Sequence, residues 1–166
     1  MLTRLTGLKT IPKIPEGIVL RSLKQEEENE FIQLVNTGFE FERVKLGDIQ
    51  KWKTESPPFD EEWIHIAESN GELVSVVVAK PDAGYNKFFN AKRGYLGPAA
   101  TLREYRGKNL ASALAVRAMN SLFEQGMDSV CLFTLETNLP SVTLLRKIGF
   151  EVGYSWKFMH KHFDSQ

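Results

Sequence analysis

The sequence predicts one α+β domain, in which a mixed, mostly antiparallel sheet of about six or seven strands is flanked by about four helices. Three observations support this fold class. Two strand-like segments flank Asn70-Gly71, the preferred two-residue turn of a β-hairpin. Strand–helix–strand alternation follows later in the chain. Residues 106–125 carry the clearest helical pattern, with apolar side chains in two adjacent rows.

The chain begins with a segment that lacks a regular pattern. Pro12 and Pro15 interrupt residues 1–16, so we expect a loosely attached N-terminal arm there. Residues 17–166 are then a single domain, and its first element is a short strand at residues 18–23.

Two helices and the hairpin follow. In residues 25–39, apolar side chains recur at helical spacing, and glutamates in the first turn complement the helix dipole. A shorter helix at residues 46–54 ends before two consecutive prolines. The hairpin strands are residues 62–68, which alternate weakly, and the Val-rich residues 73–79.

The second half alternates between strands and helices. Residues 81–92 form a polar and aromatic connection, and residues 95–102 form a strand that carries Pro98. Gly126 ends the long helix. The remaining elements are a buried strand at 129–135, a helix at 139–148 and a final strand within 154–162.

Composition excludes several classes of function. Lys+Arg and Asp+Glu both number 21, so the net charge of zero removes the electrostatic argument for nucleic acid. Cys131, the single cysteine, lies in an apolar run and is interpreted as a buried hydrophobe. With three histidines it gives no metal-ligand spacing, so we expect no metal. No segment has the length of a membrane span or the pattern of a signal peptide, which favours the cytoplasm.

The segment at residues 105–111, Tyr-Arg-Gly-Lys-Asn-Leu-Ala, stands between a strand and the start of the long helix. Unpaired amides and the helix dipole make such a terminus an anion site, and Arg106 and Lys108 add positive charge. A helix start with solvated basic residues is the alternative. The sequence contains neither of the two common nucleotide-binding glycine motifs, so nucleotide triphosphatases and nicotinamide enzymes lose their main support.

Two blocks together resemble a known family. Arg106-Gly-Lys-Asn-Leu-Ala111 is similar to the acetyl-CoA signature of the GCN5-related N-acetyltransferases, Gln/Arg-x-x-Gly-x-Gly/Ala. Thr137-Asn138, Ser141 and the closing Gly149-Phe150 resemble the end of the family core. The order of elements also matches, so the resemblance implies the acyl-CoA N-acyltransferase fold and acetyl-CoA as co-substrate.

The resemblance implies which residues bind coenzyme A. Amides of the 106–111 loop would bind its pyrophosphate, and amides at residues 100–102 would pair with the pantetheine arm, one of them facing the thioester oxygen. Asn138 would hold the arm on its other side. The expected cofactor-binding residues are Ala100, Thr101, Leu102, Arg106, Gly107, Lys108, Asn109, Leu110, Ala111, Asn138, Ser141 and Leu145.

Two positions depart from the family pattern. Asn109 stands where the family has its central glycine, and asparagine is one of the few other residues that tolerate positive φ. Leu145 stands where many members have a tyrosine that protonates the leaving thiolate. We expect position 145 to face the sulfur. Ser141, Tyr95 and Tyr154 are candidate substitutes for the proton donor.

The resemblance implies direct attack of an amine on the thioester, with no acyl-enzyme. Glu136, at the end of a central strand, is the candidate base, and its alternative is an exposed strand-end acid; His65 is a second candidate or a structural histidine. The acceptor is the primary amine of a small molecule or a peptide. Phe88-Phe89 either line an acceptor pocket with other aromatics (Trp63, Tyr85, Tyr95) or form a homodimer contact.

Two rival functions stay open. The first is a coenzyme A-binding sensor or structural subunit without catalysis, which the substitutions at Asn109 and Leu145 favour. The second is an interaction domain without a cofactor, against which the basic 106–111 loop argues.

Overall fold

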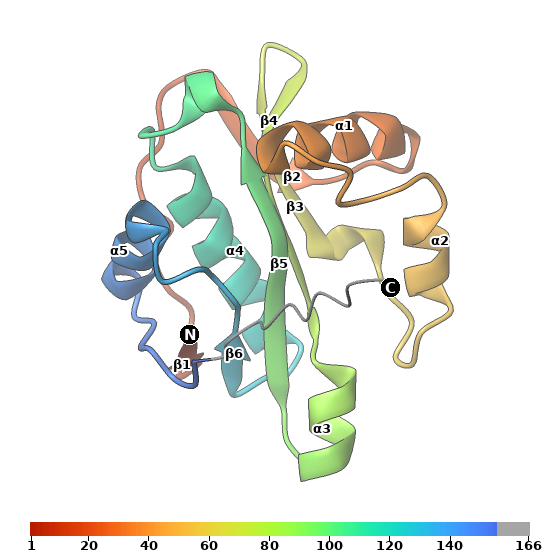
Figure 1. The fold of residues 1–166 in the computed structure, drawn as a ribbon, viewed down its shortest axis with the longest axis vertical. Coiled ribbons are helices and arrows are strands. Elements are labelled where there is room, and N and C mark those ends of the chain that lie inside the picture. Colours follow the sequence, from red (N-terminus) through yellow and green to blue (C-terminus); the bar gives the residue numbers. More distant parts are fainter. Residues whose placement is uncertain (156–166) are drawn as a thin grey trace, which may run out of the picture.

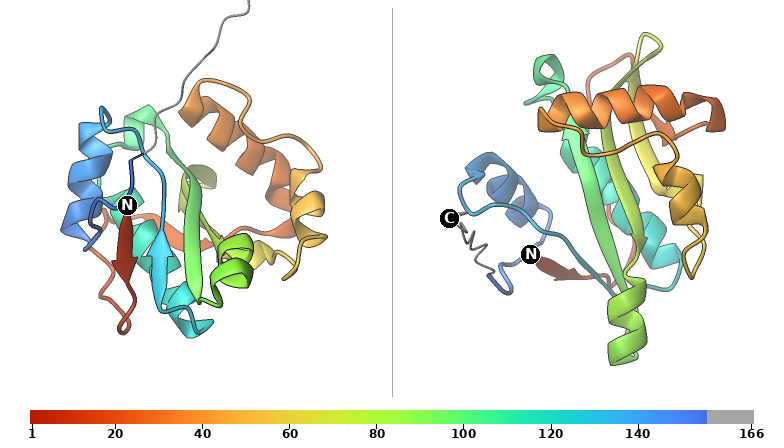
Figure 2. Two further views of the ribbon diagram at one scale, coloured as in Figure 1. Left: turned by 60° about the horizontal axis from the view of Figure 1, so that its bottom comes forward. Right: turned by 45° about the vertical axis from the view of Figure 1, so that its right-hand side comes forward.

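The structure, a computed structural model, describes residues 1–155 and shows one sheet between two layers of helices (Figures 1 and 2). In this part of the chain, six strands lie in the order β1-β6-β5-β4-β3-β2, and β5 and β6 are the parallel pair. The predicted mixed, mostly antiparallel sheet is confirmed. The strands are β1 (Leu2–Arg4), β2 (Ile18–Ser22), β3 (Ile64–Ser69), β4 (Glu72–Pro81), β5 (Arg93–Thr101) and β6 (Ser129–Cys131).

The helices cover both faces of the sheet. Helices α1 (Glu28–Phe39) and α2 (Asp48–Lys53) pack on one face, and α4 (Leu110–Glu124) packs on the other, beside α5 (Leu139–Lys147) (Figure 1). Side chains of β4 supply both cores because successive residues of a strand point to opposite faces. Val76 and Val78 belong to the α1–α2 core, whereas Val77 and Ala79 belong to the α4 core.

Helix α3 (Ala83–Phe89) was missed by the sequence analysis, which expected a connection without regular structure there. Figure 1 shows it at the end of the β4–β5 hairpin, away from the helical layers. It buries no residue, so it has no apolar stripe from which a helix could be predicted.

The N-terminal arm differs from the expectation that it is loosely attached. Strand β1 pairs with β6, and Leu5 is buried. The Leu2 amide also donates to the Glu151 carbonyl oxygen at 2.9 Å, and the Glu151 amide donates back to Leu2. Backbone hydrogen bonds on both edges hold this segment, and sequence periodicity over three residues is too short to reveal them.

Strand β6 is shorter than the predicted strand at 129–135. Its pairing with β5 ends at Tyr95 and Cys131, after which the two strands separate. Phe133 and Leu135 are therefore exposed despite their apolar character. The final strand predicted within residues 154–162 falls almost entirely outside the described residues.

Candidate functional site

The 106–111 loop has the backbone conformation that the sequence suggested. Asn109 has φ 62° and ψ 11°, a left-handed conformation, and Gly107 has φ 75°. These two residues keep the segment out of the helix, which therefore begins at Leu110 and not at residue 106 as predicted. The unusual asparagine thus occupies the positive-φ position that its alignment with a glycine implied.

The loop presents amides at the start of α4. Asn109 provides no side-chain cap, although its carbonyl oxygen accepts the first helical hydrogen bond, from Ala113 at 2.9 Å. The amides of residues 110–112 thus lack intrahelical acceptors, as at any helix start. Gly107, Lys108 and Asn109 are exposed, whereas the Leu110 side chain is buried in the core. Leu110 can therefore contact a ligand only through its backbone.

The two basic side chains of the loop are placed differently. The Lys108 ammonium lies over the ring of Tyr105, 4.8 Å from its centroid. The Arg106 Nε donates to the Thr101 carbonyl oxygen at 3.1 Å, which brings the guanidinium across the end of β5. Arg106 therefore links the loop to the strand edge beside it.

That strand edge carries the free backbone groups. The Leu102 amide donates to the Val74 carbonyl oxygen at 2.9 Å. Contrary to the expectation, this amide is therefore not available to a ligand. Alternate amides along a strand point to opposite edges, so Ala100 also faces β4, and Thr101 faces the side where β6 has separated. Among residues 100–102, Thr101 is thus the one whose backbone can pair with an added chain.

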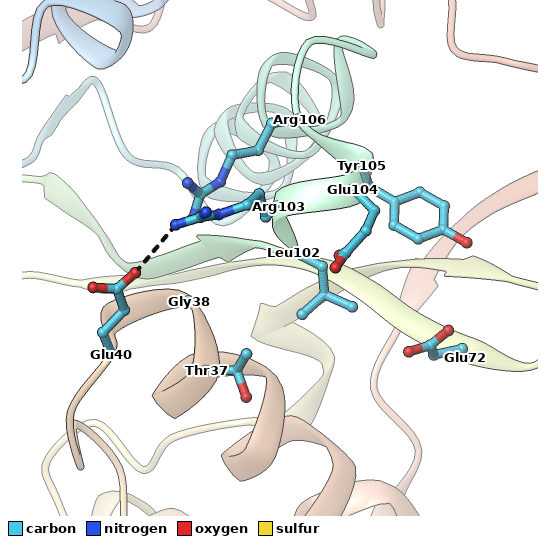
Figure 3. Close-up of a pocket in the computed structure, with 9 residues that line it drawn as sticks. All are labelled: Thr37, Gly38, Glu40, Glu72, Leu102, Arg103, Glu104, Tyr105 and Arg106. Atoms are coloured by element: carbon cyan, nitrogen blue, oxygen red, sulfur yellow. Dashed lines mark ion pairs between the residues drawn. The ribbon is translucent and has the colours of Figure 1, made fainter.

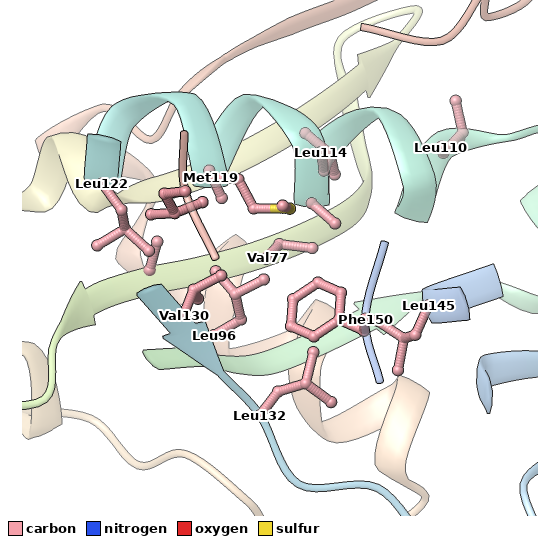
Figure 4. Close-up of a cluster of buried hydrophobic side chains, with 14 of the residues drawn as sticks. Val77, Leu96, Leu110, Leu114, Met119, Leu122, Val130, Leu132, Leu145 and Phe150 are labelled. Carbon is pink, nitrogen blue, oxygen red and sulfur yellow. The ribbon is translucent and has the colours of Figure 1, made fainter. Parts of the chain in front are cut away.

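Leu145 does not have the position that the sequence analysis expected. Its side chain is 7% exposed and belongs to the core beneath α4. Figure 4 shows it gathered with Phe150 and Leu132. An apolar side chain at this point of the amphipathic helix α5 packs inward. A leucine has no polar atom that would favour exposure to solvent or to a ligand.

The β6–α5 segment holds the other predicted residues. The Asn138 side-chain oxygen accepts from the Ser141 amide at 3.4 Å and caps α5. Glu136 is exposed and accepts from the Ser155 hydroxyl at 3.0 Å. Neither Glu136 nor Ser141 lines either of two cavities formed by residues 1–155.

The larger cavity, of about 540 Å³, lies between the end of α1 and the segment that leads into the 106–111 loop (Figure 3). Two arginines and three glutamates share its wall, and Arg103 pairs with Glu40 at 3.6 Å. This mixed charge favours neither anions nor cations. Its lining is Thr37, Gly38, Glu40, Glu72, Leu102, Arg103, Glu104, Tyr105 and Arg106.

The smaller cavity, of about 180 Å³, is called the Arg43 pocket here. It lies on the α1–α2 face of the sheet, where β5 bulges against β4 after Leu96. Among the described residues, its lining combines two cations with aromatic rings and contains no carboxylate. The lining residues are Arg43, Val44, Trp52, Phe59, Val78, Lys80, Tyr95, Gly97 and Pro98.

Tyr95 joins this pocket to the gap between β5 and β6. It is the last β5 residue paired with β6, and its ring lies 6.0 Å from that of Phe133, centroid to centroid. Burial raises the pKa of the Tyr95 phenol. The phenol therefore keeps its proton at neutral pH, and it can donate a hydrogen bond.

His65 is a structural histidine. Its side chain is 2% exposed, and its Nδ1 contacts the Arg117 guanidinium of α4. Burial, with the positive charge of Arg117, lowers its pKa from 6.5 to about 3. His65 is thus neutral at physiological pH and lines neither cavity, so the alternative of a second base loses its support.

The other aromatic candidates do not line either cavity. Trp63 packs edge-on against Phe59, with centroids 5.3 Å apart, but lines no cavity itself. Tyr85, Phe88 and Phe89 cluster on α3, where Phe88 is 82% exposed. A homodimer contact through Phe88-Phe89 stays a prediction.

Residues 1–155 offer neither a membrane span nor a metal centre. No helix in this part of the chain is long and apolar enough to cross a membrane. No group of three or more His, Cys, Asp or Glu side chains among the same residues is arranged to hold a metal ion.

Comparisons with known proteins bear on the family and the fold of the chain. A mycothiol acetyltransferase of Saccharomonospora viridis is 24% identical over 152 residues, which cover 84% of this chain and 48% of that protein. The chain spans about half the length of the mycothiol acetyltransferases that it matches.

Solved structures share the fold. A GCN5-related N-acetyltransferase from Sphaerobacter thermophilus superposes with a TM-score of 0.74 at 21% identity, over 92% of this chain and 47% of that one. A chain of the NatC complex bound to Gag peptide and CoA gives 0.67 at 22% identity, over 81% and 84% of the two chains. The sequence model of the acetyltransferase (GNAT) domain matches residues 19–153, and the chain therefore belongs to the GNAT acetyltransferase family.

Proposed function

We propose that this protein transfers the acetyl group of acetyl-CoA to a primary amine, with both substrates bound together. The observation that carries the proposal is the pairing of two features. The 106–111 loop presents free amides at the start of α4, and the adjacent edge of β5 is open where β6 has separated. A diphosphate followed by an amide-containing arm is the chemistry that these two features would bind side by side.

The cofactor contacts follow from this placement. Amides of Gly107 to Ala111 hold the pyrophosphate, and Lys108 adds its charge. The open edge at Thr101 would hold the pantetheine arm, and the Arg106 side chain would then release the Thr101 carbonyl oxygen. The Asn138 side-chain oxygen already caps α5, so its amide nitrogen is the group left to hold the arm.

The reaction needs little covalent chemistry from the protein. The neutral amine attacks the thioester carbon, a C–N bond forms, and the C–S bond breaks as the thiolate leaves with the electron pair. The attacking nitrogen loses one proton to water, and the thiolate gains one. Positioning the two substrates and donating hydrogen bonds to the thioester oxygen are the main contributions of the protein.

Tyr95 is our candidate for the proton donor to the thiolate. Leu145, at the position of the family tyrosine, is buried and apolar. The Tyr95 phenol lies at the deep end of the β5–β6 gap and stays protonated because its pKa is raised by burial. These properties suit a general acid.

Release of free thiol from acetyl-CoA in the presence of an amine panel tests the function. Turnover that depends on the amine supports it. Calorimetric binding of acetyl-CoA without turnover by any amine favours the rival function, a coenzyme A-binding sensor or structural subunit. An absence of both binding and turnover would exclude the transferase as well as that rival.

A further inference from the structure

We propose that the Arg43 pocket is the acceptor subsite and that it selects a small amine that also carries a carboxylate group. This inference rests on the proposed function for the transfer itself. It goes further by naming the chemical class of the acceptor and the residues that recognise it.

The position of the pocket makes it the acceptor subsite. We place the pantetheine arm along Thr101, running towards the point where β5 and β6 meet. Its acetyl group would then reach the bulge at residues 97–98. Gly97, Pro98 and Tyr95 line the Arg43 pocket. An amine in the pocket therefore approaches the thioester from the α1–α2 face, opposite the 106–111 loop and α4.

The charge of the pocket selects an anion. Arg43 and Lys80 are its cationic side chains, and none of its lining residues within 1–155 carries a carboxylate. Lys80 pairs at 3.5 Å with Glu55 at the rim, which offsets part of its charge. Within residues 1–155, Arg43 forms no ion pair, and a guanidinium matches the two oxygens of a carboxylate. The larger cavity, with three glutamates, shows no such bias.

The backbone of Arg43 is held in place by its neighbours, and the guanidinium of this exposed residue lies 5.9 Å from the centroid of the Phe39 ring. The Asn36 side-chain oxygen accepts from the amides of Arg43 and Val44, at 2.8 and 2.9 Å, and the Asn36 amide group donates to the Val44 carbonyl oxygen at 2.9 Å. These three bonds fix the backbone of the α1–α2 loop at the pocket. Trp52 and Tyr95 then provide apolar walls for the carbon atoms of the acceptor.

The same cations favour the reactive form of the acceptor. Positive charge near an amine lowers its pKa, which raises the fraction of neutral, nucleophilic amine. The cavity volume of about 180 Å³ is below the range of about 300–1,000 Å³ that is typical of drug-sized ligands. The pocket therefore fits an acceptor group of amino-acid size.

The test compares glycine, L-alanine and β-alanine, each with its carboxamide. Binding is followed by tryptophan fluorescence, because Trp52 lines the pocket, and transfer by release of free thiol. We expect the acids to bind and react about tenfold better than the amides, the loss expected for one charge-assisted hydrogen bond. Arg43→Gln should remove the preference, Arg43→Lys should restore part of it, and Lys45→Gln, on the same loop but outside the pocket, should leave it unchanged.

The outcomes separate the two proposals. Amides that bind and react as well as acids would overturn the anion preference and leave the transferase intact. Arg43→Gln would do the same if it weakened the binding of acids and amides equally. Acids that bind to the parent but not to Arg43→Gln, without any transfer, would support the anion pocket and count against the transferase. Failure of every acid to bind would overturn the pocket assignment.

Discussion

A Cβ atom placed on Gly38 of α1 would lie 2.6 Å from the Cβ of Ala100 on β5, closer than two non-bonded carbon atoms approach in proteins. The last turn of α1 thus rests directly on the strand whose next residue, Thr101, borders the open edge at which we propose that the pantetheine arm binds. This contact sets the height of α1 above the sheet beside the larger cavity, which Gly38 also lines.

The first prediction concerns this contact. Gly38→Ala should destabilise the fold by about 1–2 kcal/mol, because overpacking outweighs the gain in helix propensity. Ala100→Gly should restore part of that loss in the double variant, since the next atom, the Ala100 Cα, would be 3.5 Å away. Denaturant unfolding of the four proteins measures the coupling, and additive effects would show that α1 does not rest on Ala100.

The second prediction concerns pH and His65. The unfolded chain takes up a proton on His65 near pH 6.5, whereas the folded protein does so only at about pH 3. Stability contributed by this residue is therefore complete above pH 6.5 and falls as the pH is lowered towards 3. The slope approaches about 1.4 kcal/mol per pH unit.

His65→Asn provides the control for that pH dependence. Asparagine keeps an acceptor near the Arg117 guanidinium but does not titrate in this range. Unfolding free energies measured from pH 8 to pH 4 should fall less steeply for the variant than for the parent. Parallel curves would mean that His65 takes up its proton at the same pH in the folded and unfolded states.

Much of the fold was predictable because long, strongly patterned elements carry their own signal. Helix α4 and the β3–β4 hairpin are examples, since apolar rows mark the first and Asn70-Gly71 marks the second. Helix α3 and strand β1 were not predictable. Helix α3 buries nothing, and three-residue β1 is stabilised by partners more than a hundred residues away.

The candidate site divides in the same way. The left-handed conformation of Asn109 was predictable, because few residue types tolerate it and the loop motif placed it. Which amides of residues 100–102 face away from β4, towards the open edge of β5, depends on strand register, and a sequence does not give the register. Of the residues that line the Arg43 pocket, the sequence analysis named only Tyr95 as a candidate for the site, because the pocket joins the α1–α2 loop to β4 and β5, and no local motif marks such a meeting.

The third prediction tests the backbone of the 106–111 loop. Asn109→Gly should bind acetyl-CoA as well as the parent or better, and Asn109→Val should bind at least tenfold more weakly, because a β-branched residue disfavours positive φ. Calorimetric titration measures both. Gly107→Val should also weaken binding, but through its φ of 75° and not through crowding, since a Cβ at this position would meet no atom within 4 Å outside its chain neighbours. Equal affinities for all of these variants would place the phosphates elsewhere.

The fourth prediction follows from the burial of Leu145. Leu145→Tyr should lower the free energy of unfolding by about 1–3 kcal/mol, because the larger ring must displace Phe150 or Leu132. Leu145→Met, which conserves volume, should cost less than about 1.5 kcal/mol. Thermal melting of the two variants distinguishes a Leu145 side chain buried in the core from one that faces a ligand. A tyrosine variant that melts like the parent would indicate that position 145 faces the bound cofactor and not the core.

The last prediction tests Tyr95 as the proton donor. Tyr95→Phe removes the phenol but keeps the ring that packs against Phe133, so acetyl-CoA binding and melting should change little. We expect kcat to fall about tenfold, below the 10²–10⁴-fold typical of general acids, because a thiolate leaves readily even without a proton. Burial raises the pKa of Tyr95, so the parent should lose activity only at strongly alkaline pH. The pH–rate profile of the variant should lack this alkaline decrease. Tyr85→Phe, on α3 and outside both cavities, is the matched control. Equal kcat and identical pH profiles for parent and Tyr95→Phe would leave solvent as the source of the proton.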